Sequence, residues 1–256
     1  MGATHLLFHN QGRGRPIGGG VAPAFVPTDI DGCQLWLDGS DITTLFQDSA
    51  KTTPVTADGN VVGAWADKSG NGNDATRTPV ANKPLYKTSI QNGESVVRFD
   101  GINDALLLGG MTVGVGSLTF FIATNPTSIA ATLKYFIDIH VGRLIVAHTT
   151  DDAAFKVGWY DGAFDSVAAA QTGAQSLCWH FTSGGNGEVF RDGSSLGTAA
   201  YTAKAIGGNV GLFSEADGSS KYVSGDAFEV IIYDSALSTG NRQAVETYLN
   251  NKWAIY

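Results

Sequence analysis

The sequence predicts an all-β protein, an antiparallel sandwich or barrel, with one helix near its C-terminal end. Short apolar runs recur at intervals of roughly ten residues, which is typical of such folds. Between them lie dipeptides that favour tight turns. These turn dipeptides are Asp-Gly pairs that begin at Asp31, Asp38, Asp58, Asp100, Asp161, Asp192 and Asp217, and Asn-Gly pairs that begin at Asn71, Asn92 and Asn186.

No stretch approaches about 18 consecutive apolar residues, so we expect no membrane-spanning helix.

Length and composition favour one main domain. The chain has 256 residues, of which 43% are hydrophobic, enough to bury a sizeable core.

The net charge of −8 argues against a nucleic-acid partner, because phosphate contacts need clustered Lys and Arg and none cluster here. Cys33 and Cys178 lie far apart inside strand-like runs, so we expect two buried free thiols.

Residues 1–28 differ in composition from the rest, because a short apolar piece precedes a run rich in Gly, Arg and Pro. Such a segment cannot offset its own ordering entropy, so we predict an extended arm at 1–28 and one domain at 29–256. The piece THLLF is too short for a secretion signal, and we expect the chain to fold in the cytoplasm where it is made. The arm is interpreted either as a disordered leader or as a docking segment, with the candidate docking residues Leu6, Leu7, Phe8, Arg13 and Arg15.

The stretch VVRFDGINDALLL at 96–108 predicts a central β-hairpin. An alternating strand leads into Asp100-Gly101, and a second apolar run follows. The segment 40–84 reads as irregular. Further strands are predicted at 33–37, 118–124, 135–141, 144–149, 155–160, 177–182, 188–191, 210–213 and 227–233.

The last segment predicts a helix that Ser238 or Thr239 can cap. We expect its apolar face to seal one edge or end of the sheets. That face consists of Ala244, Val245, Tyr248, Leu249 and Trp253.

The stretch WADKSGNGNDA at 65–75 is the most specific feature of the irregular segment. Its Asp, Ser and Asn side chains are typical of turns with local hydrogen bonds, and they are also oxygen ligands for Ca²⁺. The spacing is not that of an EF-hand, since Thr78 stands where a bidentate Glu is needed. The loop is interpreted as turn-forming, with a structural Ca²⁺ at Asp67, Asn71 and Asp74 as the alternative.

The acidic residues do not form a pattern that predicts catalysis. A glycosidase on such a fold needs two carboxylates at alternate positions of a strand. Asp138, Glu188 and Glu229 each lack an acid two positions away, and Asp226 would face away from Glu229 in a regular strand. The sequence also lacks nucleophile-elbow, P-loop and dinucleotide motifs. We therefore expect no enzymatic activity.

Trp159, Tyr160 and Asp161 form the best candidate for a carbohydrate-binding cluster. They stand at a strand end that runs into the Asp161-Gly162 turn. A sugar ring has an apolar face and a rim of hydroxyls, so its sites combine an aromatic platform with a few polar groups. The alternative is that both aromatic side chains pack structurally.

Several stretches of the chain resemble the signature stretches of concanavalin A-like, laminin-G-like jelly-roll domains. They are LWLDGSD at 35–41, WADKSGNGNDA at 65–75, VVRFDGINDALLL at 96–108, VFRDG at 189–193, FEVIIYDSALS at 228–238 and NRQAVETYLNNKWAI at 241–255. The resemblance covers about residues 29–256 and implies a two-sheet antiparallel jelly-roll sandwich. Domains of this kind are similar to lectin modules and accessory parts of glycoside hydrolases, and this variant often appears in bacteriophage structural proteins and bacterial surface proteins.

The resemblance implies two alternative functions. The first is a non-enzymatic bacteriophage virion protein, a capsid decoration, head fibre or tail component. It would dock to other virion proteins through residues 1–28 and contact host-surface glycans. The second is a carbohydrate-binding, lectin-like module or adhesin of a bacterial surface protein. A homo-oligomer is compatible with the first function, although no heptad repeat supports one.

Overall fold

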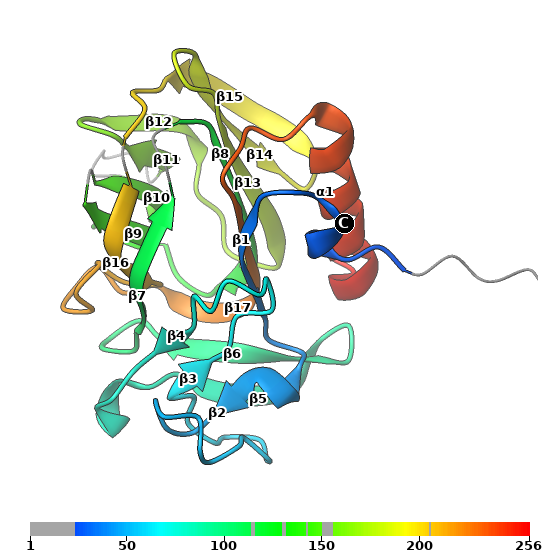
Figure 1. Ribbon diagram of the computed structural model, residues 1–256, viewed down its shortest axis with the longest axis vertical. Coiled ribbons are helices and arrows are strands. Elements are labelled where there is room, and N and C mark those ends of the chain that lie inside the picture. Colours follow the sequence, from blue (N-terminus) through cyan, green and yellow to red (C-terminus); the bar gives the residue numbers. More distant parts are fainter. Residues whose placement is uncertain (1–23, 114–115, 130–131, 142, 150–155, 205) are drawn as a thin grey trace, which may run out of the picture.

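The computed structural model describes residues 24–256, apart from 114–115, 130–131, 142, 150–155 and 205. These residues form two antiparallel sheets packed face to face, with a helix on the outer side of one sheet (Figure 1). The predicted two-sheet jelly-roll sandwich with a C-terminal helix is confirmed. Of the predicted arm, only residues 24–28 belong to the described part, where the short 3₁₀ helix η1 (Pro27–Asp29) begins.

The first sheet, sheet A, has the strand order β15-β14-β13-β8-β17-β6-β5, with β1 paired to β17. Its central strands are buried on both faces, because the second sheet covers one side and the helix covers the other. This explains the nearly continuous apolar runs of β8 and β17. The strands are β1 (Cys33–Asp38), β5 (Leu85–Gln91), β6 (Glu94–Asp100), β8 (Leu118–Pro126), β13 (Gln175–Phe181), β14 (Asn186–Arg191), β15 (Ser194–Ala200) and β17 (Ser224–Tyr233).

The second sheet, sheet B, has the order β12-β11-β10-β9-β16-β7-β4-β3-β2. One face meets sheet A in the central core, around Trp65, Trp159 and Trp179, and the other face lies outside the sandwich. Its strands are β2 (Leu45–Phe46), β3 (Ala64–Trp65), β4 (Ala75–Thr76), β7 (Leu106–Val113), β9 (Lys134–Val141), β10 (Leu144–Thr149), β11 (Lys156–Tyr160), β12 (Phe164–Ala169) and β16 (Ile206–Leu212). Two more 3₁₀ helices lie in the connections, η2 (Ile42–Thr44) and η3 (Val80–Asn82).

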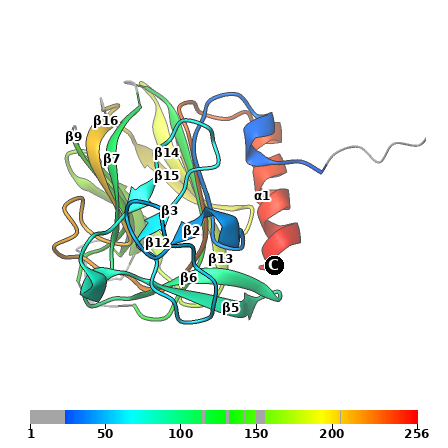
Figure 2. The same cartoon turned by 60° about the horizontal axis from the view of Figure 1, so that its bottom comes forward.

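The helix α1 (Thr239–Trp253) covers the outer face of sheet A (Figure 2). Ser238 caps it, because its hydroxyl accepts the backbone N–H of Asn241 at 3.2 Å. Val245, Leu249 and Trp253 are fully buried on strands of sheet A. The prediction that the helix seals an edge or end was therefore wrong. Among the described residues, no helix is long and apolar enough to span a bilayer.

The predicted central hairpin at Asp100-Gly101 was also wrong, because this turn carries the chain from one sheet to the other. β6 pairs with β5 and β17 in sheet A, whereas β7 pairs with β4 and β16 in sheet B. The true hairpin partner of β6 is β5, and the turn between them is Asn92-Gly93, with φ of 52° and 80°.

Cys33 and Cys178 are both free and buried, as predicted.

Candidate functional site

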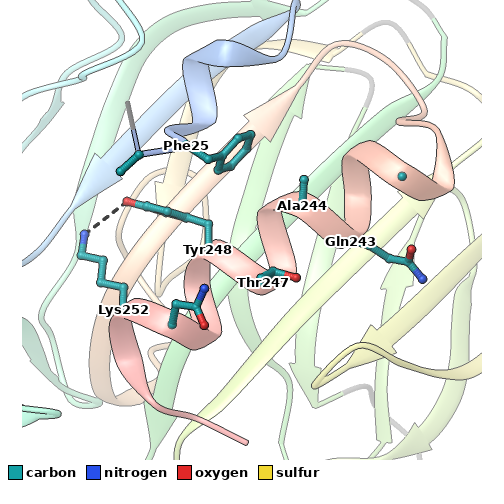
Figure 3. A pocket seen from close by; sticks show the side chains of 9 residues that line it. Phe25, Gln243, Ala244, Thr247, Tyr248 and Lys252 are labelled. Atoms are coloured by element: carbon teal, nitrogen blue, oxygen red, sulfur yellow. Dashed lines mark hydrogen bonds between the residues drawn. The ribbon is translucent and has the colours of Figure 1, made fainter. Parts of the chain in front are cut away.

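A groove of about 640 Å³ runs along the exposed side of α1 (Figure 3). Phe25 forms one wall, and its ring meets Tyr248 edge-on with centroids 5.9 Å apart. The polar atoms at the end of the groove, Tyr248 OH and Lys252 Nζ, both bond to Glu229 beneath the helix. The other polar side chains that line the groove are Gln243, Thr247 and Asn251, all on α1.

A second hollow, which we call the sheet-face pocket, lies on the outer face of sheet B. Tyr135 and Ile145 line it, and together with Ala147 they belong to an apolar cluster separate from the central core. These side chains therefore point away from sheet A. The pocket has a volume of about 290 Å³, and its lining comes from four connected regions of the sheet: Leu133, Tyr135, Arg143, Ile145, Tyr160, Phe164, Glu215 and Lys221.

Two aromatic rings give the sheet-face pocket an apolar wall. Tyr160 and Phe164 face each other across the β11–β12 hairpin, with ring centroids 5.0 Å apart and planes inclined by 58°. Both rings are half-buried, so part of each faces solvent. Their strands are hydrogen-bonded to the rest of the sheet, which holds the rings in place without a ligand.

Charged side chains form another wall of the pocket. Arg143 Nη2 lies 3.1 Å from Glu215 Oε1, and the guanidinium lies 5.9 Å from the centroid of the Tyr160 ring. Ser220 donates its hydroxyl to the second oxygen of Glu215 at 2.5 Å. Lys221 completes this wall. The pocket thus combines aromatic faces with charged hydrogen-bonding groups, as a site for a polar ring requires.

Asp138 on β9 supports Arg143 from below. Its side chain is 2% exposed, and Oδ2 lies 3.6 Å from Arg143 Nη2 and accepts the N–H of Ala216 at 3.2 Å. Oδ1 is buried with no hydrogen-bond partner in the part of the chain that the structure describes. Burial raises the pKa of this carboxyl. Asp138 is therefore a positioning group rather than a group that a ligand can reach.

A third hollow, of about 360 Å³, lies beside the link between β6 and β7 and contains Asp100 and Asp104. Asp100 Oδ1 accepts three backbone N–H groups of the turn, and Asp104 Oδ2 accepts the N–H of Asp100 at 2.9 Å. Burial raises the pKa of Asp104 to about 6. Burial acts in the same direction on Asp100, but the backbone N–H groups outweigh it and lower its pKa. Both carboxylates hold the turn together.

The predicted cluster of Trp159, Tyr160 and Asp161 is divided by the structure. Tyr160 lines the sheet-face pocket, as a binding residue would. Trp159 is fully buried in the central core, with its ring edge-on to Phe181 at 5.4 Å, so its prediction as a sugar platform was wrong. Asp161 is 6% exposed, and its Oδ2 accepts the N–H of Thr202 at 2.6 Å. It fixes a connection and does not line the pocket.

The predicted calcium ligands Asp67, Asn71 and Asp74 hold the 65–75 loop together. Both oxygens of Asp67 accept backbone N–H groups, including that of Trp36 on β1 at 3.0 Å. Asp74 accepts the N–H of Asp67 at 2.9 Å and pairs with Lys51, and the Asn71 amide donates to a carbonyl of β1. These contacts show a turn-forming loop, and the binding of a calcium ion by these residues stays a prediction.

The candidate docking residues Leu6, Leu7, Phe8, Arg13 and Arg15 lie outside the described residues.

Two of the carboxylates considered for catalysis, Asp226 and Glu229, lie apart from the sheet-face pocket, on sheet A. Asp226 pairs with Arg98 through two bonds of 2.6 and 2.9 Å, and Glu229 is buried beneath α1. Opposite faces were predicted for a regular strand, but the register of β17 shifts between Ala227 and Glu229, and both side chains face the outer side of sheet A. Of the described residues that line the pocket, Glu215 alone carries a carboxylate, and it is paired with Arg143.

No family model matches the chain, and no curated protein matches it in sequence. Solved structures do share its fold. Domain 4 of an extracellular GH43 arabinanase from Geobacillus stearothermophilus, solved with arabinotriose, has a TM-score of 0.52 at 13% identity, over 85% of this chain and 97% of that domain. A GH54 α-L-arabinofuranosidase has a TM-score of 0.60 at 13% identity, over 85% of this chain and 62% of its own.

The sialidase of Trypanosoma rangeli is also similar, with a TM-score of 0.56 at 11% identity over 87% of this chain. This chain corresponds to about a third of the sialidase, since 33% of that protein is covered. At such low identities the similarity shows the fold alone. The chain therefore has a β-sandwich fold that also occurs in proteins acting on carbohydrates.

Proposed function

We propose that this chain is a non-enzymatic, carbohydrate-binding lectin-like module whose binding site is the sheet-face pocket. The observation that carries the proposal is the aromatic pair Tyr160 and Phe164 beside the charged wall of Arg143, Glu215 and Lys221. A sugar ring can lay its apolar face on the aromatic wall while its hydroxyls bond to the charged groups. The arabinanase domain of the same fold, solved with arabinotriose, supports this class of ligand.

The test is a glycan-array screen of the full chain, followed by affinity measurements with the Tyr160→Ala variant. We expect selective binding to some glycans and a loss of about five- to twelvefold in affinity in the variant, because an aromatic contact contributes about 1–1.5 kcal/mol. Tyr256→Ala is the matched control, since Tyr256 is 53% exposed and distant in sequence from the pocket residues. The absence of binding to every glycan would refute the proposal.

The same screen tests the calcium prediction when it is run with about 1 mM Ca²⁺ or with a chelator. Glycan binding that disappears with the chelator would support a metal at Asp67, Asn71 and Asp74. Binding that is equal in both conditions would leave the sheet-face pocket as a metal-independent site.

The virion function stays a prediction that depends on residues 1–28. Deletion of residues 1–23 separates it from glycan binding, because the deletion leaves Phe25, η1 and the whole sandwich in place. A virion component is expected to lose attachment to its particle in this variant and to retain its affinity for glycans. Undiminished assembly of the variant onto particles would contradict a docking arm.

A further inference from the structure

Two lysines near the sheet-face pocket lack a carboxylate partner. Lys221 lines the pocket, and Lys134 begins β9 between the lining residues Leu133 and Tyr135. In the described part of the chain, neither ammonium group has a carboxylate within 4.0 Å, whereas Arg143 beside them is paired with Glu215. Among the described residues, the charge of the arginine is therefore balanced by a carboxylate, and the charges of the two lysines are not.

The two lysines repel each other. Burial lowers the pKa of Lys134, and the charge of Lys221 lowers it further. The protein as a whole has 24 acidic and 16 basic side chains, so two neighbouring lysines with no carboxylate of the described residues within 4.0 Å are a local exception. An anion bound at Lys221 would favour its charged form and offset this repulsion.

The backbone also places the pocket cations in an unusual way. Arg143 has φ of 37° and Lys221 has φ of 61°, which is the left-handed region that residues other than glycine rarely adopt. Such conformations persist only where the surrounding structure holds them, and they are frequent at ligand sites. The carbonyl of Lys221 accepts the N–H of Tyr135 at 3.1 Å, which ties this strained residue to a strand that lines the pocket.

We infer that the ligand of the sheet-face pocket is an acidic sugar, a glycan that carries a carboxylate or sulfate group. This inference rests on the proposed function and names its ligand class. The sugar ring lies against Tyr160 and Phe164, and its acidic group lies at Lys221, which lines the pocket. Lys134 stands between the lining residues Leu133 and Tyr135, so its side chain points to the other face and it acts on the site through its charge alone. Charge-assisted hydrogen bonds are roughly twice as strong as neutral ones, so the acidic group would decide which glycans bind.

The test uses pairs of glycans that share a backbone and differ in charge: polygalacturonate with its methyl ester, alginate with its propylene glycol ester, and dextran sulfate with dextran. We expect the wild-type chain to bind at least one acidic member about tenfold or more tightly than its neutral counterpart. The pairs also distinguish the two sources of charge, because the first two carry carboxylates and the third carries sulfates.

The variant Lys221→Met, alone and with Lys134→Met, should remove the preference for the acidic member while leaving the unfolding temperature unchanged. Lys51→Met is the control, because it removes one positive charge from a lysine paired with Asp74, in the β2–β3 region of the chain. Retention of the full preference in the double variant would overturn the inference.

The outcomes separate this inference from the proposed function. Equal binding of acidic and neutral members, with a loss of both in Tyr160→Ala, would overturn the acidic ligand and leave carbohydrate binding intact. The absence of binding to every member and to the glycan array would overturn both. Acid-selective binding that the lysine variants abolish and Lys51→Met retains would support both.

Discussion

Lys252 of α1 and Glu229 of β17 form a buried ion pair, with Nζ 3.0 Å from Oε2 and Glu229 completely shielded from solvent. Lys252 also bonds to Asp38 of β1 at 2.5 Å, so one ammonium group joins the helix to two neighbouring strands. Burial raises the pKa of Glu229, although Lys252 opposes this effect. Three more donors reach the same carboxylate: Trp36 Nε1 at 2.6 Å, Tyr248 OH at 2.8 Å and Trp253 Nε1 at 2.9 Å.

Replacement of Glu229 by Ala should destabilise the protein by about 3 kcal/mol or more, because it leaves three donors without their acceptor and leaves Asp38 as the one remaining carboxylate partner of Lys252 among the described residues. Urea unfolding measures the loss. The control is Lys87→Met, which removes an exposed pair with Asp58 and should cost less than about 1 kcal/mol. Equal losses in the two variants would contradict the anchoring role of Glu229.

Asp104 is expected to make the stability depend on pH. Burial raises its pKa to about 6, above the usual 3.8, so the folded state holds the proton more tightly than the unfolded chain. This stabilisation is fully present below about pH 4 and is lost as the pH rises through about 6. Asp104→Asn removes the charge but keeps an acceptor for the N–H of Asp100, so we expect it to be more stable than the wild type by about 1–2 kcal/mol at pH 7 and about equal at pH 4.

Urea unfolding at both pH values measures this difference. Asp58→Asn is a control of opposite sign, because hydrogen bonds from Lys87 and Thr88 lower the pKa of Asp58. That variant should lose stability at neutral pH and lose less at acidic pH. A difference between Asp104→Asn and the wild type that does not change with pH would show that the carboxyl is not shifted.

The pattern of apolar runs and turn dipeptides predicted most of the strands because each depends on local sequence. The predicted turn at Asp192-Gly193 joins β14 to β15, with φ of 52° and 76°. The strands β5, β12 and β15 lacked a signal because their exposed, polar or small side chains bury little apolar surface. Their pairing comes from neighbouring strands, which the local pattern does not contain.

The site was only partly predictable for a geometric reason. Adjacent residues of a strand point to opposite faces, so Trp159 and Tyr160 could not both line one surface. Phe164 could have been found, because a hairpin around Asp161-Gly162 places it opposite Tyr160. Arg143 lies between β9 and β10, whereas Glu215 and Lys221 lie between β16 and β17. No pattern within either segment indicates that β16 lies beside β9.

Gly158 on β11 should be essential for the shape of the sheet-face pocket. A Cβ atom at this position would lie 1.8 Å from the carbonyl oxygen of Asp165, inside the hairpin that carries Tyr160 and Phe164. We expect Gly158→Ala to cost about 2 kcal/mol or more and to weaken glycan binding, because the two strands must move apart. Thermal unfolding and glycan affinity measure the two effects. Gly109→Ala, where a Cβ atom meets nothing within 4 Å, should change neither.

The link between the two sheets depends on Gly101. Its φ is 73°, and a Cβ atom there would lie 2.5 Å from Ser224 Cβ and 2.9 Å from the backbone of that residue in β17. Gly93, at the other end of β6, has φ of 80° and open space around it, so the two glycines differ mainly in their neighbours. Gly93→Ala should cost about 1 kcal/mol for the left-handed backbone alone.

Gly101→Ala carries the same backbone cost and a clash with β17, so we expect a total loss of about 3 kcal/mol. Urea unfolding of both variants isolates the contribution of the close approach as the difference between them. Equal losses would show that β6 and β17 can separate at this point without cost. The expected difference would show that the chain crosses between the sheets here because only glycine fits against Ser224.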